Sequence, residues 1–350
     1  MRPRGRIPAG GTSSRDGGDG TATVTPSRCF MSHNPRVDRV DIVIVSYCSA
    51  SELGACIGSA RTAFGSGRAV VVDNASTDGS LAVARAAGAH EVVENAANLG
   101  FAAAVNRGLR HTDTRRVLLL NPDARLESHT LLRLVAALDR EPQAAVAAPL
   151  LVDGSGRVTT GCGPVATAAR RAGLCVPGLG RAGAFRPRYQ PPSAGPRVPL
   201  VRRVDYAFGA VMLLDRNPVE AVGGFDERFF LFAEDEDLCR QLRASGREIV
   251  LDAGAVAQHE GAASSTDGAL TEAQRLYSTW LLLEKWDGRR AARVYRRGVL
   301  AAFTARSLVA MARRRPHLDQ DEIVRTADAF DQAVRSGRDP LLAAVPHDAD

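Results

Sequence analysis

The chain has 350 residues, of which 45% are hydrophobic, so it is long enough to bury a large core. Its formal net charge of +6 suits phosphate-bearing small molecules, anionic lipid and nucleic acid equally. Aromatic residues make up only 5% of the chain, which argues against a nucleic-acid surface of interleaved basic and aromatic side chains. No nucleic-acid partner is therefore expected.

The cysteines and the first residues bear on the cellular compartment. Six scattered cysteines without a CxxC pair predict reduced thiols in a reducing compartment and no structural zinc. No apolar h-region and no run of about 18 uncharged apolar residues occurs, so neither a secretory signal nor a spanning helix is expected. Residues 1–38 are expected to be a disordered extension, with Met31 as a hypothetical start of translation. We expect a cytoplasmic protein.

Strand-like and helix-like segments alternate between residues 40 and 140. The β-branched run Val40–Tyr47 is typical of a strand buried on both faces, as in a parallel sheet covered by helices. Short links between the segments favour an α/β, doubly wound fold. Further strands are expected at 69–72, 90–94 and 117–120, and helices at 52–63, 80–87, 101–110 and 130–140.

The second half of the chain is less regular. Residues 159–203 are rich in Gly, Pro, Ala and Arg, which predicts a flexible surface loop, and this loop is our candidate acceptor-selecting region. A strand is expected over 206–214, a helix over 234–245 that stops before a glycine, and a short strand over 248–251. Residues 266–350 are expected to form a helical, basic C-terminal region.

Acidic residues follow two of the predicted strands, where ligands of parallel sheets usually lie. Asp73 can accept the N3–H of a uracil or thymine base, although a plain Asx turn explains it equally well. Asp123, in Asn121-Pro122-Asp123, lies where a divalent cation that bridges two phosphates needs an oxygen ligand. Taken alone, such a tripeptide is more often a turn.

Four acidic residues, Glu234 to Asp237, open a predicted helix. Such residues ordinarily cap a helix and complement its dipole. Four adjacent carboxylates also repel one another, so we expect a cation or a substrate to use them. The helix N-terminus is expected to keep Asp235 ionised near neutrality, as a general base requires. His259 is a candidate metal ligand, although a lone histidine is more often an ordinary polar residue.

Several short segments occur together in an order that is typical of one enzyme family. They are Val43-Ile44-Val45-Ser46-Tyr47, Val71-Val72-Asp73-Asn74-Ala75-Ser76-Thr77-Asp78-Gly79, Asn98-Leu99-Gly100-Phe101-Ala102, Asn106-Arg107-Gly108, Leu120-Asn121-Pro122-Asp123, Gly209-Ala210, Gly223-Gly224-Phe225-Asp226-Glu227-Arg228-Phe229-Phe230, Glu234-Asp235, Asp237-Leu238-Cys239 and His259. Through them the chain resembles the family 2 glycosyltransferases, and their rhamnosyltransferase-like branch, from about Asp41 to Ser265.

The resemblance implies a GT-A-type nucleotide-sugar-binding fold over residues 39–265, with a mostly parallel twisted sheet flanked by helices and followed by a C-terminal helical extension. It implies an inverting transfer of sugar from a nucleotide diphosphate to an acceptor hydroxyl, with Mg²⁺ or Mn²⁺ as cofactor. L-rhamnose from dTDP-rhamnose is the preferred donor, and a UDP-sugar stays open because Asp73 can bind either pyrimidine. The acceptor hydroxyl belongs to a glycan, a lipid-linked sugar or a small molecule.

Carried over to this sequence, the resemblance also implies roles for individual residues. Asp235 matches the catalytic base, with Glu234 beside it. Asp123 stands in the metal-and-diphosphate position, and His259 matches a position that approaches the metal. The substrate-binding residues that it implies are Tyr47, Asp73, Asn74, Asn98, Gly100, Asn106, Asn121 and Gly209.

Two positions depart from the family pattern. Cys48 follows Tyr47 where the family usually has Asn, which affects the nucleotide pocket. Glu236 takes a position that is more often apolar or aromatic, so the acidic cluster is denser than usual.

Two other classes of protein compete with this interpretation. Ala9-Gly10-Gly11-Thr12 resembles the Gly-rich loop of a nucleotide-sugar pyrophosphorylase, but no apolar strand precedes it and no activating lysine follows. A catalytically inactive nucleotide-sugar-binding or scaffold protein is the alternative outside enzymes. The presence of Asp73, Asp123 and Asp235 argues against it.

The basic C-terminal region has two interpretations. Its helices pack on the catalytic domain, or residues 289–315 dock on anionic lipid. The second interpretation predicts a peripheral protein on the inner face of the plasma membrane, as a lipid-linked acceptor would suit.

Overall fold

Eleven strands and ten helices make up the part of the chain that the computed structural model describes, residues 39–64, 67–127, 129–159, 161–174, 200–261, 267–313 and 320–344. The extension expected over residues 1–38, with Met31, and the glycine-rich tetrapeptide at residues 9–12 lie outside these ranges. The strands are β1 (Val40–Ser46), β2 (Ala69–Asp73), β3 (Glu91–Glu94), β4 (Arg116–Leu120), β5 (Ala124–Leu126), β6 (Ala144–Val152), β7 (Cys162–Gly163), β8 (Val201–Val204), β9 (Tyr206–Ala207), β10 (Val211–Asp215) and β11 (Glu248–His259). The helices are α1 (Ala50–Phe64), α2 (Ser80–Ala86), α3 (Phe101–Arg110), α4 (Thr130–Arg140), α5 (Ala168–Leu174), α6 (Arg216–Ala221), α7 (Glu234–Ala244), α8 (Gly268–Arg313), α9 (Gln320–Ser336) and α10 (Pro340–Ala344).

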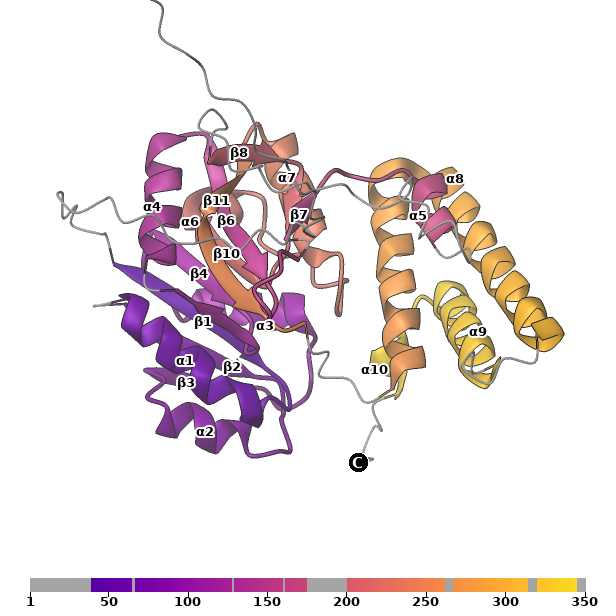
Figure 1. Ribbon diagram of the computed structural model, residues 1–350, viewed down its shortest axis with the longest axis horizontal. Helices are drawn as coiled ribbons and strands as arrows, with labels where there is room; N and C mark the ends of the chain where they lie inside the picture. Colours follow the sequence, from indigo (N-terminus) through magenta and orange to yellow (C-terminus); the bar gives the residue numbers. More distant parts are fainter. Residues whose placement is uncertain are drawn as a thin grey trace, which may run out of the picture. The chain divides into compact units, whose positions relative to one another are not determined.

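One nine-stranded sheet organises the first 260 residues (Figure 1). Its order is β3-β2-β1-β4-β10-β6-β11-β5, with β8 paired to β11. Every residue of β1, β2 and β4 is buried, because helices cover both faces of the sheet. Helices α1, α2 and α4 contribute to the apolar core on one face, and α3, α6 and α7 to the core on the other.

The α/β fold class is confirmed, but the sheet is mixed rather than mostly parallel. Within the group β3-β2-β1-β4, each strand runs parallel to its neighbours. Strand β10 lies between β4 and β6 and runs antiparallel to both. Strand β11 is parallel to β6 and antiparallel to β5 and β8. The apolar run of β10 is typical of a buried strand in either direction, so the pattern could not fix its orientation.

Most predicted elements of the first half are present, and α3 and α4 have the predicted bounds. Strand β6 was not predicted, because its alanine-rich sequence lacks a strong β-branched signal. Strand β11 is 12 residues long instead of four, and its irregular pairing between Asp252 and Val256 carries it on to His259. The strand expected over 206–214 is divided into β9 and β10.

The segment expected as a loop over 159–203 contains β7, α5 and the start of β8, while residues 175–199 lie outside the described ranges. Helix α5 is held against α8 by close packing: a Cβ added at Gly298 would lie 2.7 Å from the Ala172 Cβ. Apolar residues of α5, α8 and α9 share a separate core. None of the helices in the described ranges offers an apolar stretch able to cross a membrane.

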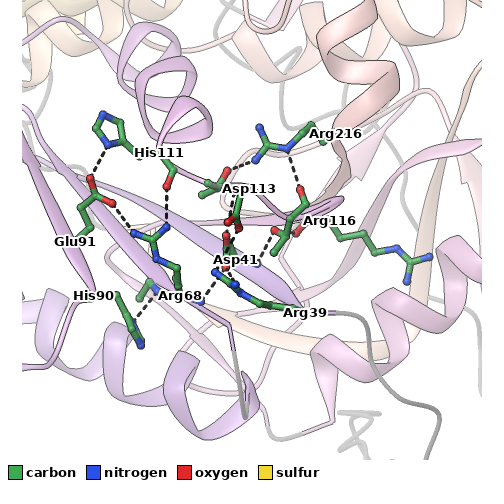
Figure 2. A network of polar contacts seen from close by, with 12 residues as sticks. Arg39, Asp41, Arg68, His90, Glu91, His111, Asp113, Arg116 and Arg216 are labelled. Atoms are coloured by element: carbon green, nitrogen blue, oxygen red, sulfur yellow. Dashed lines mark hydrogen bonds and ion pairs between the residues drawn. The ribbon is translucent and has the colours of Figure 1, made fainter.

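A polar network closes the amino ends of the parallel strands, away from the strand ends expected to bind ligands (Figure 2). The fully buried Asp41 carboxylate accepts hydrogen bonds from the backbone N–H groups of Arg68, at 2.9 Å, and Asp113, at 3.4 Å. The Arg68 side chain in turn donates to Glu91 at 2.7 Å, and the same carboxylate contacts His111 Nδ1 at 2.6 Å. A carboxylate in this position fixes β1 against the loops before β2 and β4.

Replacing Asp41 with Ala should therefore destabilise the fold. Two backbone donors would lose their acceptor, and we expect the free energy of unfolding to fall by about 1–3 kcal/mol in a urea titration. Asp113→Ala is the matched control: its side chain is 70% exposed, so a change of about 0.5 kcal/mol or less is expected. Equal losses in both variants would contradict a structural role for the buried carboxylate.

Candidate active site

The residues after β1, β2 and β4 lie at one edge of the sheet. Ser46 pairs with Asp73, the last residues of β1 and β2. The antiparallel β10 begins at this edge, with Val211 opposite Leu120. The Asn121 N–H consequently donates to the Ala210 carbonyl at 2.9 Å. This pairing brings the Gly209-Ala210 segment beside the strand-end residues that the sequence places about ninety positions earlier.

The loops after β1 and β2 are bonded to each other. Both Asp73 oxygens accept hydrogen bonds from Ser76, one from its N–H at 2.8 Å and one from its hydroxyl at 2.7 Å. The Ser76 hydroxyl oxygen accepts the Cys48 N–H at 2.9 Å. The Asp73 carboxylate, which is 1% exposed, therefore holds the turn that follows β2, while its role toward a base stays a prediction.

Cys48, one of the two departures from the family pattern, has a left-handed backbone with φ of 47°. Asn adopts this conformation more readily than other residues with a Cβ, which gives a physical reason for the usual Asn at this position. The neighbouring Tyr47 is 38% exposed, and its ring is therefore accessible at this edge.

Asn74 and Gly100 connect the β2 loop to the start of α3. The Asn74 side chain donates to the Gly100 carbonyl at 3.1 Å, and the Asn98 carboxamide oxygen accepts the Gly100 N–H at 3.0 Å. Gly100 has φ of 82°, and a Cβ there would lie 2.4 Å from the Phe230 carbonyl oxygen. That same oxygen accepts the Phe101 N–H at 2.7 Å. Glycine is therefore required where the 230 loop meets α3.

Asn106 takes a different position. Its carboxamide accepts the Phe225 N–H at 3.0 Å and donates to the Phe225 carbonyl at 2.8 Å. The same amide nitrogen donates to Glu227 at 2.9 Å. These contacts tie α3 to the Gly-Gly-Phe-Asp-Glu segment, so Asn106 bridges two elements of the fold. Its contact with substrate stays a prediction.

Asp123 and His259 lie side by side although 136 positions separate them in the chain. His259 ends β11, where it pairs with Ala124 of β5, and its Nε2 is 3.4 Å from Asp123 Oδ1. The nearby Asn121 side-chain oxygen is buried and has no hydrogen-bond partner in the described part of the chain. No cluster of three or more His, Cys, Asp or Glu side chains suited to a metal occurs among the described residues.

Asp235 is held by two backbone donors. Its Oδ2 accepts the Gly209 N–H at 2.9 Å and its Oδ1 accepts the Glu236 N–H at 2.7 Å. Burial raises the pKa of Asp235 to about 6, against the opposing effect of these hydrogen bonds. Desolvation, which the sequence did not reveal, is the largest influence on this pKa, and the backbone donors at the start of α7 and at Gly209 oppose it. The carboxylate is still mostly ionised at neutral pH.

Glu234, which is also buried, lies next to Asp235 in α7. Burial, together with the charge of Asp235, raises the pKa of Glu234 well above its ordinary value. Its Oε2 is buried and unpartnered within the described ranges. The two neighbouring carboxyls therefore titrate as an interacting pair.

Side-chain cations of the chain itself compensate the other two acidic residues, Glu236 and Asp237. Arg171 of α5 donates twice to Glu236, at 2.6 and 2.7 Å, and Arg240 donates to it at 2.8 Å. Lys285 of α8 donates to Asp237 at 2.8 Å. The prediction that a bound cation or substrate must balance all four carboxylates is thus wrong for these two, which leaves Glu234 and Asp235.

The three aspartates that the sequence singled out lie on one continuous set of contacts. Asn74, next to Asp73, bonds to Gly100, and the following Phe101 ring is 3.5 Å from the position of a Cβ on Gly209. Gly209 binds Asp235, and the adjoining Ala210 binds Asn121, two residues before Asp123. Sequence reasoning missed the residues that secure this arrangement, because no local pattern pairs them with their partners. They are Ser76, Arg171, Arg240 and Lys285.

Comparison with known proteins agrees with this geometry. The sequence model of glycosyl transferase family 2 matches residues 41–162. N-acetylglucosaminyl-diphospho-decaprenol L-rhamnosyltransferase of Mycobacterium tuberculosis is 28% identical over 264 residues, which cover 70% of this chain and 84% of the relative. Residues 41–162 therefore resemble glycosyl transferase family 2. The resemblance drawn from the motifs is confirmed, and the chain is a glycosyltransferase that uses a nucleotide-sugar donor.

Solved structures show the same fold at low identity. Mannosyltransferase PcManGT from Pyrobaculum calidifontis, in complex with GDP-Man and Mn²⁺, has a TM-score of 0.51 and 15% identity over 84% of this chain and 87% of its own. GalNAc-T7 with UDP, GalNAc and Mn²⁺ has a TM-score of 0.50 and 12% identity over 90% of this chain and 59% of its own. These likenesses confirm the GT-A-like arrangement of the glycosyltransferase.

Proposed function

We propose that this glycosyltransferase inverts the anomeric centre in a single displacement, with Asp235 as the general base. The observation that carries the proposal is the Asp235 carboxylate, which two backbone N–H groups hold and burial brings to a pKa of about 6. A base with a pKa near the working pH is both ionised and able to take a proton. The acceptor oxygen attacks the anomeric carbon as its proton passes to Asp235. The bond from that carbon to the diphosphate oxygen breaks on the opposite side.

A divalent cation, Mg²⁺ or Mn²⁺, fits the residues after β4 and β11. Asp123 and His259 offer an oxygen and a nitrogen 3.4 Å apart, and the unpartnered Asn121 oxygen lies in the same turn as Asp123. Such ions use one or two protein ligands together with the phosphates of a nucleotide. When bound, the ion would neutralise the leaving nucleoside diphosphate. Two protein ligands suffice for this role, so a larger cluster of metal ligands is not required.

We propose dTDP-L-rhamnose as the donor, with a UDP-sugar as the alternative. The support is the mycobacterial relative, whose name states an L-rhamnosyltransferase. Asp73 is the proposed contact to the pyrimidine, and this contact does not distinguish thymine from uracil. Comparing turnover of dTDP-L-rhamnose with that of UDP-sugars decides between the donors. The scaffold alternative predicts binding without turnover of any of them.

The same relative acts on a diphospho-decaprenol, which favours a lipid-linked acceptor for this chain. Within α8, the face opposite to its buried side carries exposed apolar and basic residues together. Val294 is 55% and Leu308 57% exposed, and Met311 lies in the same stripe at helical spacing. Arginine side chains lie on this stripe at Arg290 and Arg297. Apolar groups with guanidinium neighbours suit the surface of an anionic membrane, where we place this cytoplasmic enzyme.

Replacing Asp235 with Asn should reduce kcat by about two to four orders of magnitude, because the acceptor proton loses its base. In the wild-type enzyme kcat/KM should fall about tenfold per pH unit below pH 6, since protonated Asp235 cannot accept a proton. Rates measured between pH 5 and 8 check both points, with Asp328→Asn, at an exposed aspartate of α9, as control. Wild-type rates in the Asp235 variant would refute the assignment.

Replacing Asp123 with Ala should weaken the binding of a nucleoside diphosphate only when the cation is present. Titration calorimetry with dTDP, with and without Mn²⁺, measures this difference. The wild type should bind more tightly with the ion, whereas the variant should bind alike in both conditions. An unchanged metal effect in the variant would remove Asp123 from the proposed site.

Replacing Arg290 and Arg297 with Gln should reduce sedimentation with phosphatidylglycerol vesicles. Each arginine near an anionic surface contributes about 1 kcal/mol, so roughly a thirtyfold loss in partition coefficient is expected for the double variant. Replacing Arg335, in α9, and Arg338, just after that helix, with Gln removes the same charge elsewhere and provides the control. Sedimentation that is independent of anionic lipid in the wild type would reject the membrane contact.

A further inference from the structure

The loop before the proposed base is strained and lacks a local helix signal. Phe232 and Ala233 both have left-handed backbones, with φ of 70° and 67°, although neither is a glycine. Ala233 is the N-cap of α7, and it has no side-chain cap. Such backbone conformations persist only where surrounding contacts fix them. The position of Asp235, two residues later, must therefore be set from outside this loop.

Helix α8 supplies contacts on both sides of this loop. The Ser278 hydroxyl donates to the Leu231 carbonyl at 2.7 Å. Further along α8, the Lys285 ammonium and the Trp286 indole N–H donate to the two oxygens of Asp237, at 2.8 and 2.7 Å. Asp237 is fully buried, so an unpaired charge there would be costly. The helix thus holds the chain just before and just after Asp235.

Lys285 is the single lysine of this protein, which has 44 arginines. Its ammonium lies 2.8 Å from a carboxylate oxygen of Asp226 and 2.8 Å from one of Asp237. The Phe229 ring lies 5.9 Å and the Trp286 ring 5.8 Å from the same nitrogen. A compact point charge satisfies two carboxylates between two rings, where a planar guanidinium demands more room. In a chain that otherwise uses arginine throughout, this site therefore selects lysine.

The helix path places this lysine. Gly288 has φ of 82° and interrupts α8, so Lys285 and Trp286 belong to the last turn of residues 268–287. Asp287 of that turn contacts Arg240, which also binds Glu236. Both residues that follow Asp235 in α7 are consequently anchored by groups outside the family match at residues 41–162.

We propose that Lys285 is a positioning residue of the active site: through Asp237 it fixes the start of α7 and with it the Asp235 carboxylate. Residues 268–287 are then part of the catalytic unit and not only a support for the C-terminal helices. This inference rests on the proposed role of Asp235 as base. The ionisable groups that act on Asp235 are Glu234 and Glu236 of its own helix, Cys239 one turn on, and Tyr206 of β9.

The test compares Lys285→Met with Lys285→Arg in the full-length enzyme. A misplacement of about 1 Å costs on the order of a hundredfold in rate, so Lys285→Met should lose about that much in kcat with KM for the donor within about twofold of wild type. Lys285→Arg should recover part of kcat. Loss of the cation should also move the acid limb of the pH–rate profile upward. Arg275→Met, an exposed arginine of the same helix that pairs with Glu272, is the control and should behave as wild type.

Two readouts separate the possible failures. If Lys285→Met unfolds at lower temperature but keeps kcat and the pH profile, the lysine supports the fold alone and the proposal is wrong. If Lys285→Met does not fold, Asp237→Asn tests the same contact, and wild-type kcat in that variant overturns the proposal. If Asp235→Asn itself keeps wild-type turnover, the assignment of the base fails first, independently of Lys285.

Discussion

The structure depends on keeping one carboxylate ionised in a place from which water is largely removed. Burial raises the pKa of Asp235, and the hydrogen bonds from the N–H groups of Gly209 and Glu236 are the largest opposing influences. Those two donors come from different elements, the segment just before β10 and the first turn of α7. The sheet order that places β10 antiparallel beside β4 therefore has a chemical consequence, because it delivers the Gly209 N–H to this carboxylate.

The four consecutive acidic residues of α7 divide into two pairs with different roles. Glu236 and Asp237 bind Arg171, Arg240 and Lys285, and they anchor the helix. Glu234 and Asp235 bind no cation in the described part of the chain, and their pKa values are raised. Four acidic residues that look alike in the sequence thus become two ion-paired anchors next to two buried carboxyls without a cation.

The sequence predicted the parts of the site that depend on local patterns. An acidic residue at the end of a buried apolar run, as Asp73 in β2, or shortly after one, as Asp123 after β4, lies at the carboxyl end of a strand whatever the tertiary context. The strained residues and the ion pairs depended instead on contacts across the fold. Arg171 lies 65 positions from Glu236, in a segment whose glycine and proline content predicted a loop. His259 reached Asp123 only because β11 continues past an irregular turn that short-range alternation could not anticipate.

The family match ends at residue 162, whereas the proposed base and the residues that position it lie beyond that point. The residues that the family model matches, 41–162, contain the motifs that follow single strands, and each of these motifs is a short local pattern. The proposed base is different. Its helix begins without a side-chain cap, after two left-handed residues, so the contacts that stabilise the start of this helix must come from distant partners. The ion pairs that α7 makes with α5 and α8 offset the strain at Phe232 and Ala233. We therefore expect the residues of α7 and those of its partner helices to vary together between related enzymes. A relative that lacks the lysine should then carry an apolar residue in place of Asp237, since a lone buried carboxylate there would cost more than the pair contributes.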